Sequence, residues 1–139
     1  MFEGSGGPST VLFNAKGGFG GGFVQINVQE ELVINGTIDA DGTNAIDDST
    51  SGGGSGGSIQ VITTFLSGMG NMSTQGGNGA WRNSGGGAGG RISIRFWRSE
   101  QSAVYPNITK NWNGSVSKYG GSGANFGGNG KQGTLFTTT

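Results

Sequence analysis

The sequence predicts an all-β fold, a glycine-rich parallel β-solenoid of about three coils with a closing terminal strand. Three observations lead to this prediction. Of the 139 residues 33 are glycine, while only 31% are hydrophobic and 12% are charged. A glycine-rich block recurs at a spacing of about 34 residues, and a short run of alternating apolar and polar residues follows each copy. A thin core shared by stacked repeats can be filled by so few apolar residues.

The glycine-rich block occurs in three copies, which span 17–26, 52–61 and 85–94 together with their apolar runs. Alternation of apolar and polar residues is the pattern of a strand that buries one face. Glycine at this density disfavours a helix. We expect two roles for the glycine runs, which are turning the chain through positive φ and allowing neighbouring coils to approach closely.

A second block follows the first at a near-constant distance and defines the coils. It spans 36–42, 70–76 and, after an insertion, 114–120. The whole chain, 1–139, is therefore predicted to be one module with coils at about 14–50, 51–84 and 85–125. Stacking the equivalent strands in register places apolar residues in three core ladders. The ladders are Val24, Ile59 and Ile92, then Ile26, Val61 and Ile94, then Ile38, Met72 and Val116.

The two ends of the chain match each other, because residues 2–13 read FEGSGGPSTVLF and residues 126–137 read FGGNGKQGTLFT. Similar composition alone is one explanation. The other is that each end completes its counterpart in a neighbouring copy, which predicts head-to-tail stacking of a homopolymer or of tandem modules. The predicted polymerisation interface consists of Phe2, Val11, Leu12, Phe13, Phe126, Leu135 and Phe136.

The repeat resembles a known family. The matching residues are Gly52–Val61 (GGGSGGSIQV), Leu66–Gly76, Gly85–Ile94 and Gly133–Phe136. They are similar to the glycine-rich parallel β-helix repeats of microbial and protist surface and extracellular adhesin-like proteins. The resemblance covers nearly the whole chain apart from an insertion at about 98–113, although Phe19 and Phe23 depart from the pattern. It implies an extracellular or cell-surface location and a role as a stalk, a fibre or an adhesive shaft.

The densest group of acidic residues follows the short strand of the first coil. It comprises Asp39, Asp41, Asp47 and Asp48. Carboxylate oxygens on a flexible turn are ligands that Ca²⁺ prefers, so calcium is one interpretation. The other is a solvated strand face followed by a polar turn, because Asp39 and Asp41 alternate with Ile38 and Ala40. We favour the second interpretation and expect no other cofactor.

Four Asn-x-Ser/Thr sequons occur in segments that we expect to be turns, where a glycan would be exposed. The candidate glycosylation sites are Asn35, Asn71, Asn107 and Asn113. In an extracellular protein of eukaryotic origin, these sites would make the chain a glycoprotein.

Aromatic residues of the third coil offer a second kind of site. Tyr105, Trp112 and Tyr119 could form a platform for a carbohydrate, or could pack beneath the insertion. Arginines interleaved with Trp81, Phe96 and Trp97 would suit a nucleic acid, but the formal charge is zero, so we expect no nucleic-acid partner. No apolar run approaches the roughly 20 residues of a membrane-spanning helix.

Catalysis has little support in the sequence. The chain contains no cysteine and no histidine, which excludes thiolate nucleophiles, Cys/His zinc sites and histidine-based triads. The adjacent pairs Glu30-Glu31 and Asp47-Asp48 are not expected to face each other across a groove. We therefore predict that the chain is not an enzyme but a structural unit that stacks into an extracellular fibre or stalk. The alternative is a carbohydrate-binding or adhesive module of a larger surface protein.

Overall fold

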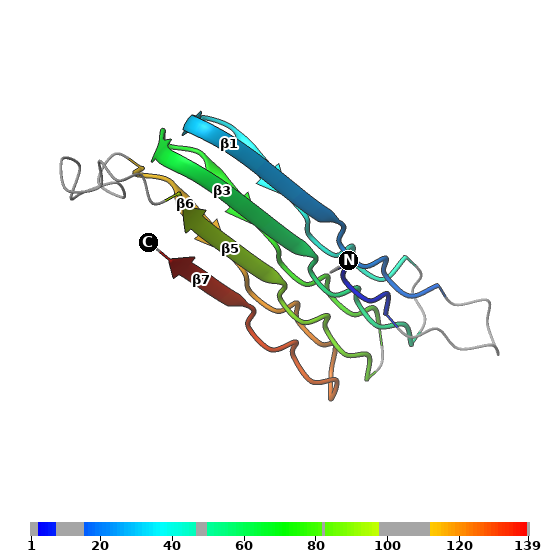
Figure 1. Cartoon of the computed structure of the whole chain (residues 1–139). Coiled ribbons are helices and arrows are strands. Elements are labelled where there is room, and N and C mark those ends of the chain that lie inside the picture. Colours follow the sequence, from blue (N-terminus) through cyan, green and yellow to red (C-terminus); the bar gives the residue numbers. More distant parts are fainter. Residues whose placement is uncertain (1–2, 8–15, 47–49, 82, 98–111, 139) are drawn as a thin grey trace.

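The computed structural model describes residues 3–7, 16–46, 50–81, 83–97 and 112–138 (Figure 1). Its strands form two sheets, and every strand pair is parallel. The four-stranded sheet has the order β1 (Phe23–Val33), β3 (Ser58–Ser67), β5 (Arg91–Phe96) and β7 (Thr134–Thr138). The three-stranded sheet has the order β2 (Thr37–Asp39), β4 (Asn71–Ser73) and β6 (Ser115–Ser117). The described residues form no helix, so the predicted all-β class with parallel strands is confirmed.

One strand of each sheet falls within each of the ranges 14–50, 51–84 and 85–125. Equivalent residues of successive ranges therefore lie side by side in the sheets. The register places Val24 beside Ile59, Ile59 beside Ile92, and Ile92 beside Leu135 of β7. The second set comprises Ile26, Val61, Ile94 and Thr137, and the third comprises Ile38, Met72 and Val116.

The hydrophobic core contains residues from both sheets, and it is most complete in the middle of the stack. Ile59, Val61 and Met72 are fully buried because equivalent residues cover them on both sides. Val24 and Ile38 of the first repeat and Val116 of β6 are only partly buried. Full burial of such a side chain contributes ~1.5–3 kcal/mol, so the inner repeat gains more from packing than the outer ones.

Glycine-rich segments continue both sheets as layers of extended chain (Figure 1). The first layer consists of residues 17–22, 51–57, 84–90 and 127–133, which lead into β1, β3, β5 and β7. The second layer consists of residues 40–46, 74–80 and 118–123, which follow β2, β4 and β6. Backbone hydrogen bonds join neighbouring segments within a layer, for example Gly18 N–H to the Gly52 carbonyl and Gly21 N–H to the Ser55 carbonyl.

Hydrogen bonds also join the two glycine layers, and they recur every three residues. Gly54 donates to the carbonyl of Thr43, at 3.0 Å, and Gly57 donates to that of Ala40, at 2.8 Å. A period of three without bonds inside the segment is typical of a polyproline II helix. The layers are therefore held by backbone bonds between chains, whereas the sheets share an apolar core.

Close approach of these chains explains the glycine content. A Cβ atom built on Gly54 would lie 2.0 Å from the Phe19 carbonyl oxygen, and one on Gly87 would lie 1.9 Å from that of Gly54. No side chain fits in that space, so the expected role in close packing agrees with the geometry. The expected role in positive-φ turns is wrong for the glycine runs, because Gly68 alone among the described glycines has positive φ, at 101°. An extended three-residue helix needs no left-handed residue.

Candidate functional site

The two outer strands of the four-stranded sheet present open edges. β1 pairs only with β3, and β7 pairs only with β5, so one side of each outer strand has no neighbour among the described residues. An unpaired strand edge carries a row of N–H and C=O groups that can recruit another chain. These edges lie at opposite ends of the stack, as Figure 1 shows.

Apolar residues are also exposed at the β7 end. Leu135 is 44% exposed and Phe136 is 52% exposed, whereas Ile92, which lies next to Leu135 in the register, is 0% exposed. Phe126 is 94% exposed. The ladder of Val24, Ile59, Ile92 and Leu135 thus ends on a side chain that nothing in the described chain covers on its outer side.

The N-terminal half of the predicted interface is only partly described. Phe2, Val11, Leu12 and Phe13 lie outside the described residues. Residues 3–7, which we call the N-terminal segment, lie against 17–22, where Gly4 donates to the Gly21 carbonyl and Gly7 to the Gly18 carbonyl. This pairing is antiparallel, whereas 127–133 runs parallel to 84–90. The described parts of the two matching ends therefore occupy different environments.

Asp41 of the acidic cluster accepts hydrogen bonds from the next repeat. Asp41 Oδ1 accepts hydrogen bonds from Ser73 Oγ, at 2.6 Å, and from the backbone N–H of Gln75, at 2.5 Å. Asp39 Oδ1 accepts the backbone N–H of Asp41, at 2.7 Å. Asp47 and Asp48 lie outside the described residues, and the described residues contain no group of three acidic, histidine or cysteine side chains that could hold a metal ion.

Three of the four sequon asparagines lie among the described residues. Asn35 and Asn113 are exposed beside strand ends, and Asn35 Oδ1 accepts the backbone N–H of Met69, at 3.3 Å. Asn71 lies within β4, where its Oδ1 accepts a hydrogen bond from Ser115 Oγ, at 3.0 Å. Asn107 lies outside the described residues.

The described aromatic residues of the third coil lie on separate elements and differ in exposure. Trp112 packs against the hydrophobic core, and its Nε1 is buried without a hydrogen-bond partner in the described part of the chain. Tyr119 is 60% exposed after β6, and Trp97 is 46% exposed after β5. Tyr105 lies outside the described residues. Exposed aromatic side chains thus lie on separate elements.

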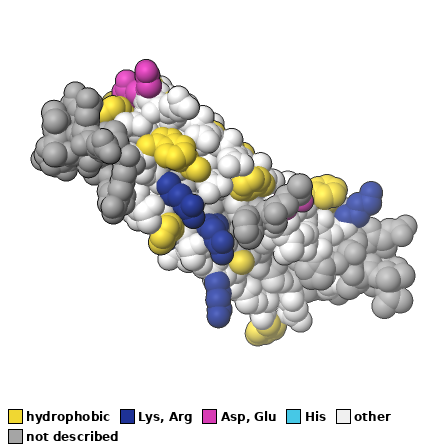
Figure 2. Space-filling model, in the orientation of Figure 1, with side chains coloured by type: hydrophobic (Ala, Val, Ile, Leu, Met, Phe, Trp, Pro, Cys, Tyr) yellow, Lys and Arg dark blue, Asp and Glu magenta, His cyan; other side chains and the backbone are white. Residues whose placement is uncertain are grey.

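Basic side chains lie on the outer face of the four-stranded sheet (Figure 2). Arg91 and Arg95 alternate along β5 with the buried Ile92 and Ile94. Together with Phe23, Gln60 and Ser93, among others, they line a shallow hollow of about 180 Å³. Both arginines therefore lie on the outer face of β5.

A ladder of asparagine side chains escaped the sequence analysis. Asn44 Oδ1 accepts the backbone N–H of Asn78, and Asn78 Oδ1 accepts that of Ser122, both at 2.7 Å. The sequence signal for this ladder is the recurrence of asparagine at the repeat spacing, at Asn44 and Asn78. The glycine layers also have a signal that was missed, which is the spacing of three between glycines such as Gly4 and Gly7, or Gly87 and Gly90.

Comparisons with known proteins give no family model, no curated protein and no solved structure that matches the chain. Within the described residues, no helix is long and apolar enough to cross a membrane. The candidate site therefore rests on the geometry alone, and its strongest feature is the pair of open edges with an unfinished core ladder.

Proposed function

We propose that the chain is a β-solenoid unit that stacks end to end into an extracellular fibre or surface stalk. The observation that supports this most is that both outer strands of the parallel sheet have an open edge and that β7 also exposes Leu135 and Phe136. An extra strand beside β7 would pair its backbone and cover Leu135. β1 of a second copy is suited to this position, since its own outer edge is open and its Val24 belongs to the same ladder.

The stacking implies a definite register. Because Val24, Ile59, Ile92 and Leu135 follow one another across the sheet, continuation of the ladder sets Leu135 beside Val24 of the next copy. Thr137 then lies beside Ile26 of that copy. Backbone pairing that continues across every junction would make the fibre resistant to heat and to proteolysis. The extracellular location follows from the resemblance of the repeats to those of surface proteins.

Negative-stain electron microscopy of the purified chain tests the stacking. We expect unbranched fibres from the unmodified protein and monodisperse particles from Leu135→Lys, because a lysine at the end of the ladder reaches solvent in the single chain but would be buried at a junction. Met69→Lys is the matched control, since Met69 is also exposed but follows β3, an inner strand that is paired on both sides. Single particles of the unmodified chain at high concentration would overturn the proposal.

The second candidate function is a carbohydrate-binding or adhesive module, and the exposure of Trp97 and Tyr119 favours it. Exposed aromatic rings are the usual means of stacking on sugars. In that case binding of soluble polysaccharides would depend on Trp97 and Tyr119, and Leu135→Lys would leave it unchanged. The two functions therefore differ in where the chain is sensitive to mutation.

A further inference from the structure

The outer side of the first glycine layer carries parallel grooves between neighbouring segments, and one groove is filled by the chain itself. The N-terminal segment lies between 17–22 and 51–57. On one side Gly4 and Gly7 donate to the carbonyls of Gly21 and Gly18, both at 2.7 Å. On the other side Ser55 N–H donates to the Ser5 carbonyl, at 2.8 Å. Two acceptors and one donor thus define how this groove binds an extended glycine-rich chain.

The next groove, between 51–57 and 84–90, repeats the same three groups. Because Phe23, Ser58 and Arg91 share one register position, Gly18 and Gly21 correspond to Gly53 and Gly56, and Ser55 corresponds to Ala88. In the described chain no hydrogen bond reaches the Gly53 carbonyl, the Gly56 carbonyl or the Ala88 N–H. We call this the vacant groove.

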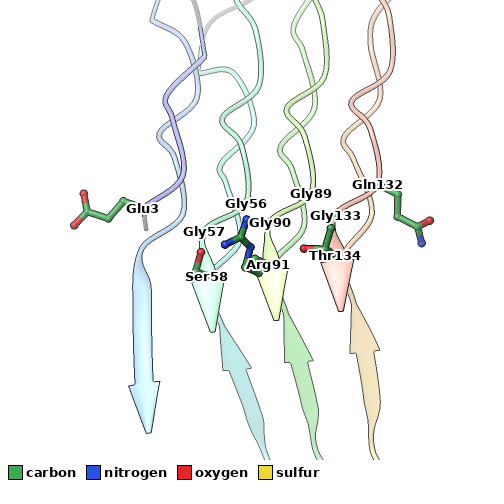
Figure 3. Close-up of a pocket in the computed structure, with 10 residues that line it drawn as sticks. All are labelled: Glu3, Gly56, Gly57, Ser58, Gly89, Gly90, Arg91, Gln132, Gly133 and Thr134. Atoms are coloured by element: carbon green, nitrogen blue, oxygen red, sulfur yellow. The ribbon is translucent and has the colours of Figure 1, made fainter. Parts of the chain in front are cut away.

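The exposure of the two grooves differs along one side. Gly52 and Ser55, which face the filled groove, are buried or half-buried, whereas the corresponding Gly85 and Ala88 are exposed; the acceptors Gly53 and Gly56 are buried, as Gly18 and Gly21 are. A hollow of about 420 Å³ lies at the strand end of the vacant groove and extends to the next segment, lined by Gly56, Gly57, Gly89, Gly90, Arg91 and Gly133 among others (Figure 3). Glu3 borders the same hollow but points away from the other lining residues (Figure 3).

The chain carries an occupant of suitable chemistry, which is the N-terminal segment of a second copy. In its own groove this segment uses the N–H groups of Gly4 and Gly7, while within the described residues the N–H groups of Glu3 and Gly6 have no acceptor. Glu3 and Gly6 are three residues apart, as are the acceptors Gly53 and Gly56. The segment can therefore keep its own bonds and donate from another side to a second groove.

Charge favours the same arrangement. In the filled groove Gly4 bonds to Gly21 in an antiparallel run, so Glu3 lies beside Gly22, one residue before the register position that Phe23 shares with Ser58. One groove further along, that register position is occupied by Arg91. A second copy docked in the vacant groove would therefore bring its Glu3 within one or two residues of the register position of Arg91, and attraction between these opposite charges would favour this register.

We propose that two copies of the chain associate face to face, each placing its Glu3–Gly7 segment in the vacant groove of the other. The two N-terminal segments form a shared layer between the two first glycine layers. This association is lateral and uses neither strand edge, so it does not depend on end-to-end stacking. In the proposed fibres it would join two fibres side by side.

Disulfide trapping tests the contact directly, because the chain contains no cysteine. Gly6→Cys and Ala88→Cys are prepared separately, each in the Leu135→Lys background, which removes stacking. A Cβ atom on Gly6 has 3.4 Å to its nearest neighbour, the Gly18 carbonyl oxygen, and Ala88 is exposed, so both sites accept a cysteine. We expect the mixture to form a covalent heterodimer under mild oxidation at least about tenfold faster than the control mixture of Gly6→Cys with Ser122→Cys.

Ser122 lies on the exposed side of the second glycine layer, away from the vacant groove. Equal rates of cross-linking in the two mixtures would overturn the proposal. Sedimentation of Ala88→Lys and Ser122→Lys, each also in the Leu135→Lys background, gives an independent measurement. We expect Ala88→Lys to raise the dimer dissociation constant by about tenfold or more, because its side chain fills the groove, and Ser122→Lys to leave it unchanged. If the Leu135→Lys chain stayed wholly monomeric at high concentration, the proposal would also be overturned, whether or not the unmodified chain forms fibres.

Discussion

At the scale of single residues, polar side chains act mainly by joining one repeat to the next. Asp41 is the clearest case, because one carboxylate oxygen accepts hydrogen bonds from both Ser73 and Gln75 of the following repeat. Asn44 and Asn78 do the same with backbone N–H groups one repeat further along. Polar residues of the second layer therefore satisfy backbone groups that an extended glycine-rich chain would otherwise leave to water.

The hydrogen-bond role of Asp41 and the calcium interpretation make different predictions. We expect Asp41→Ala to lower the free energy of unfolding by about 1–3 kcal/mol, because two donors lose their acceptor. Asp41→Asn keeps an oxygen at that position and should cost less. A bound metal would stabilise the folded chain in proportion to its concentration, so calcium should leave the unfolding midpoint in urea unchanged. A midpoint that rises with calcium and ceases to do so in Asp41→Asn would support the metal interpretation.

At the scale of elements, the positions of the strands were easier to predict from the sequence than the arrangement of the glycine segments. Alternation of apolar residues such as Ile92 and Ile94 is a local signal that burial on one face requires, so the positions of β1, β3 and β5 followed from the sequence. The edges of the candidate site also followed, because the repeat count leaves a first and a last strand. Exposure of Leu135 and Phe136 is a consequence of that order.

The glycine layers could not be predicted in the same way. Their hydrogen-bond partners lie in other segments, as when Gly87 donates to Gly77 and accepts from Gly121. The sequence therefore carries no local pattern of paired side chains, and an isolated glycine run is equally consistent with turns at positive φ. The position of the N-terminal segment was missed for the same reason, because its partners are backbone groups that every glycine run offers.

Which positions of a glycine segment can carry a side chain is a testable property of the element. We compare two variants of 85–90 with identical composition. Gly85→Ala with Ala88→Gly keeps the alanine on the exposed side, where a Cβ atom on residue 85 has 3.6 Å to its nearest neighbour. Gly87→Ala with Ala88→Gly moves it to a position where the Cβ atom would lie 1.9 Å from the Gly54 carbonyl oxygen.

We expect the Gly87 variant to lose about 3 kcal/mol or more of stability, because neighbouring backbone must shift to relieve the contact. The Gly85 variant should stay within about 0.5 kcal/mol of the parent, as surface changes do. Urea unfolding followed by circular dichroism measures both. Equal stability of the two variants would mean that glycine is required for flexibility and not for the close approach of the segments.

The whole molecule combines two ways of stabilising a stack of repeats. At the strand end, apolar residues of both sheets share one core, which includes Ile59, Met72 and Ile92. At the glycine end, hydrogen bonds such as those from Gly54 to Thr43 and from Gly87 to Gly77 join the layers with almost no side chains between them. Both kinds of contact continue from repeat to repeat, so each repeat is stabilised chiefly by its neighbours.

This dependence on neighbours predicts that a longer stack is more stable. Inserting a second copy of 51–84 after Ser84 adds one inner repeat, in which the counterparts of Ile59, Val61 and Met72 are covered on both sides. We expect the free energy of unfolding to rise by at least ~1 kcal/mol and its dependence on urea to steepen, because more surface is buried. The same insertion with Val61→Asp in the new copy is the control, since a carboxylate in the ladder costs more than the repeat gains. If the unmodified insertion lowered stability to the level of this control, the repeats would not be interchangeable, and stacking of whole chains through β1 and β7 would lose its physical basis.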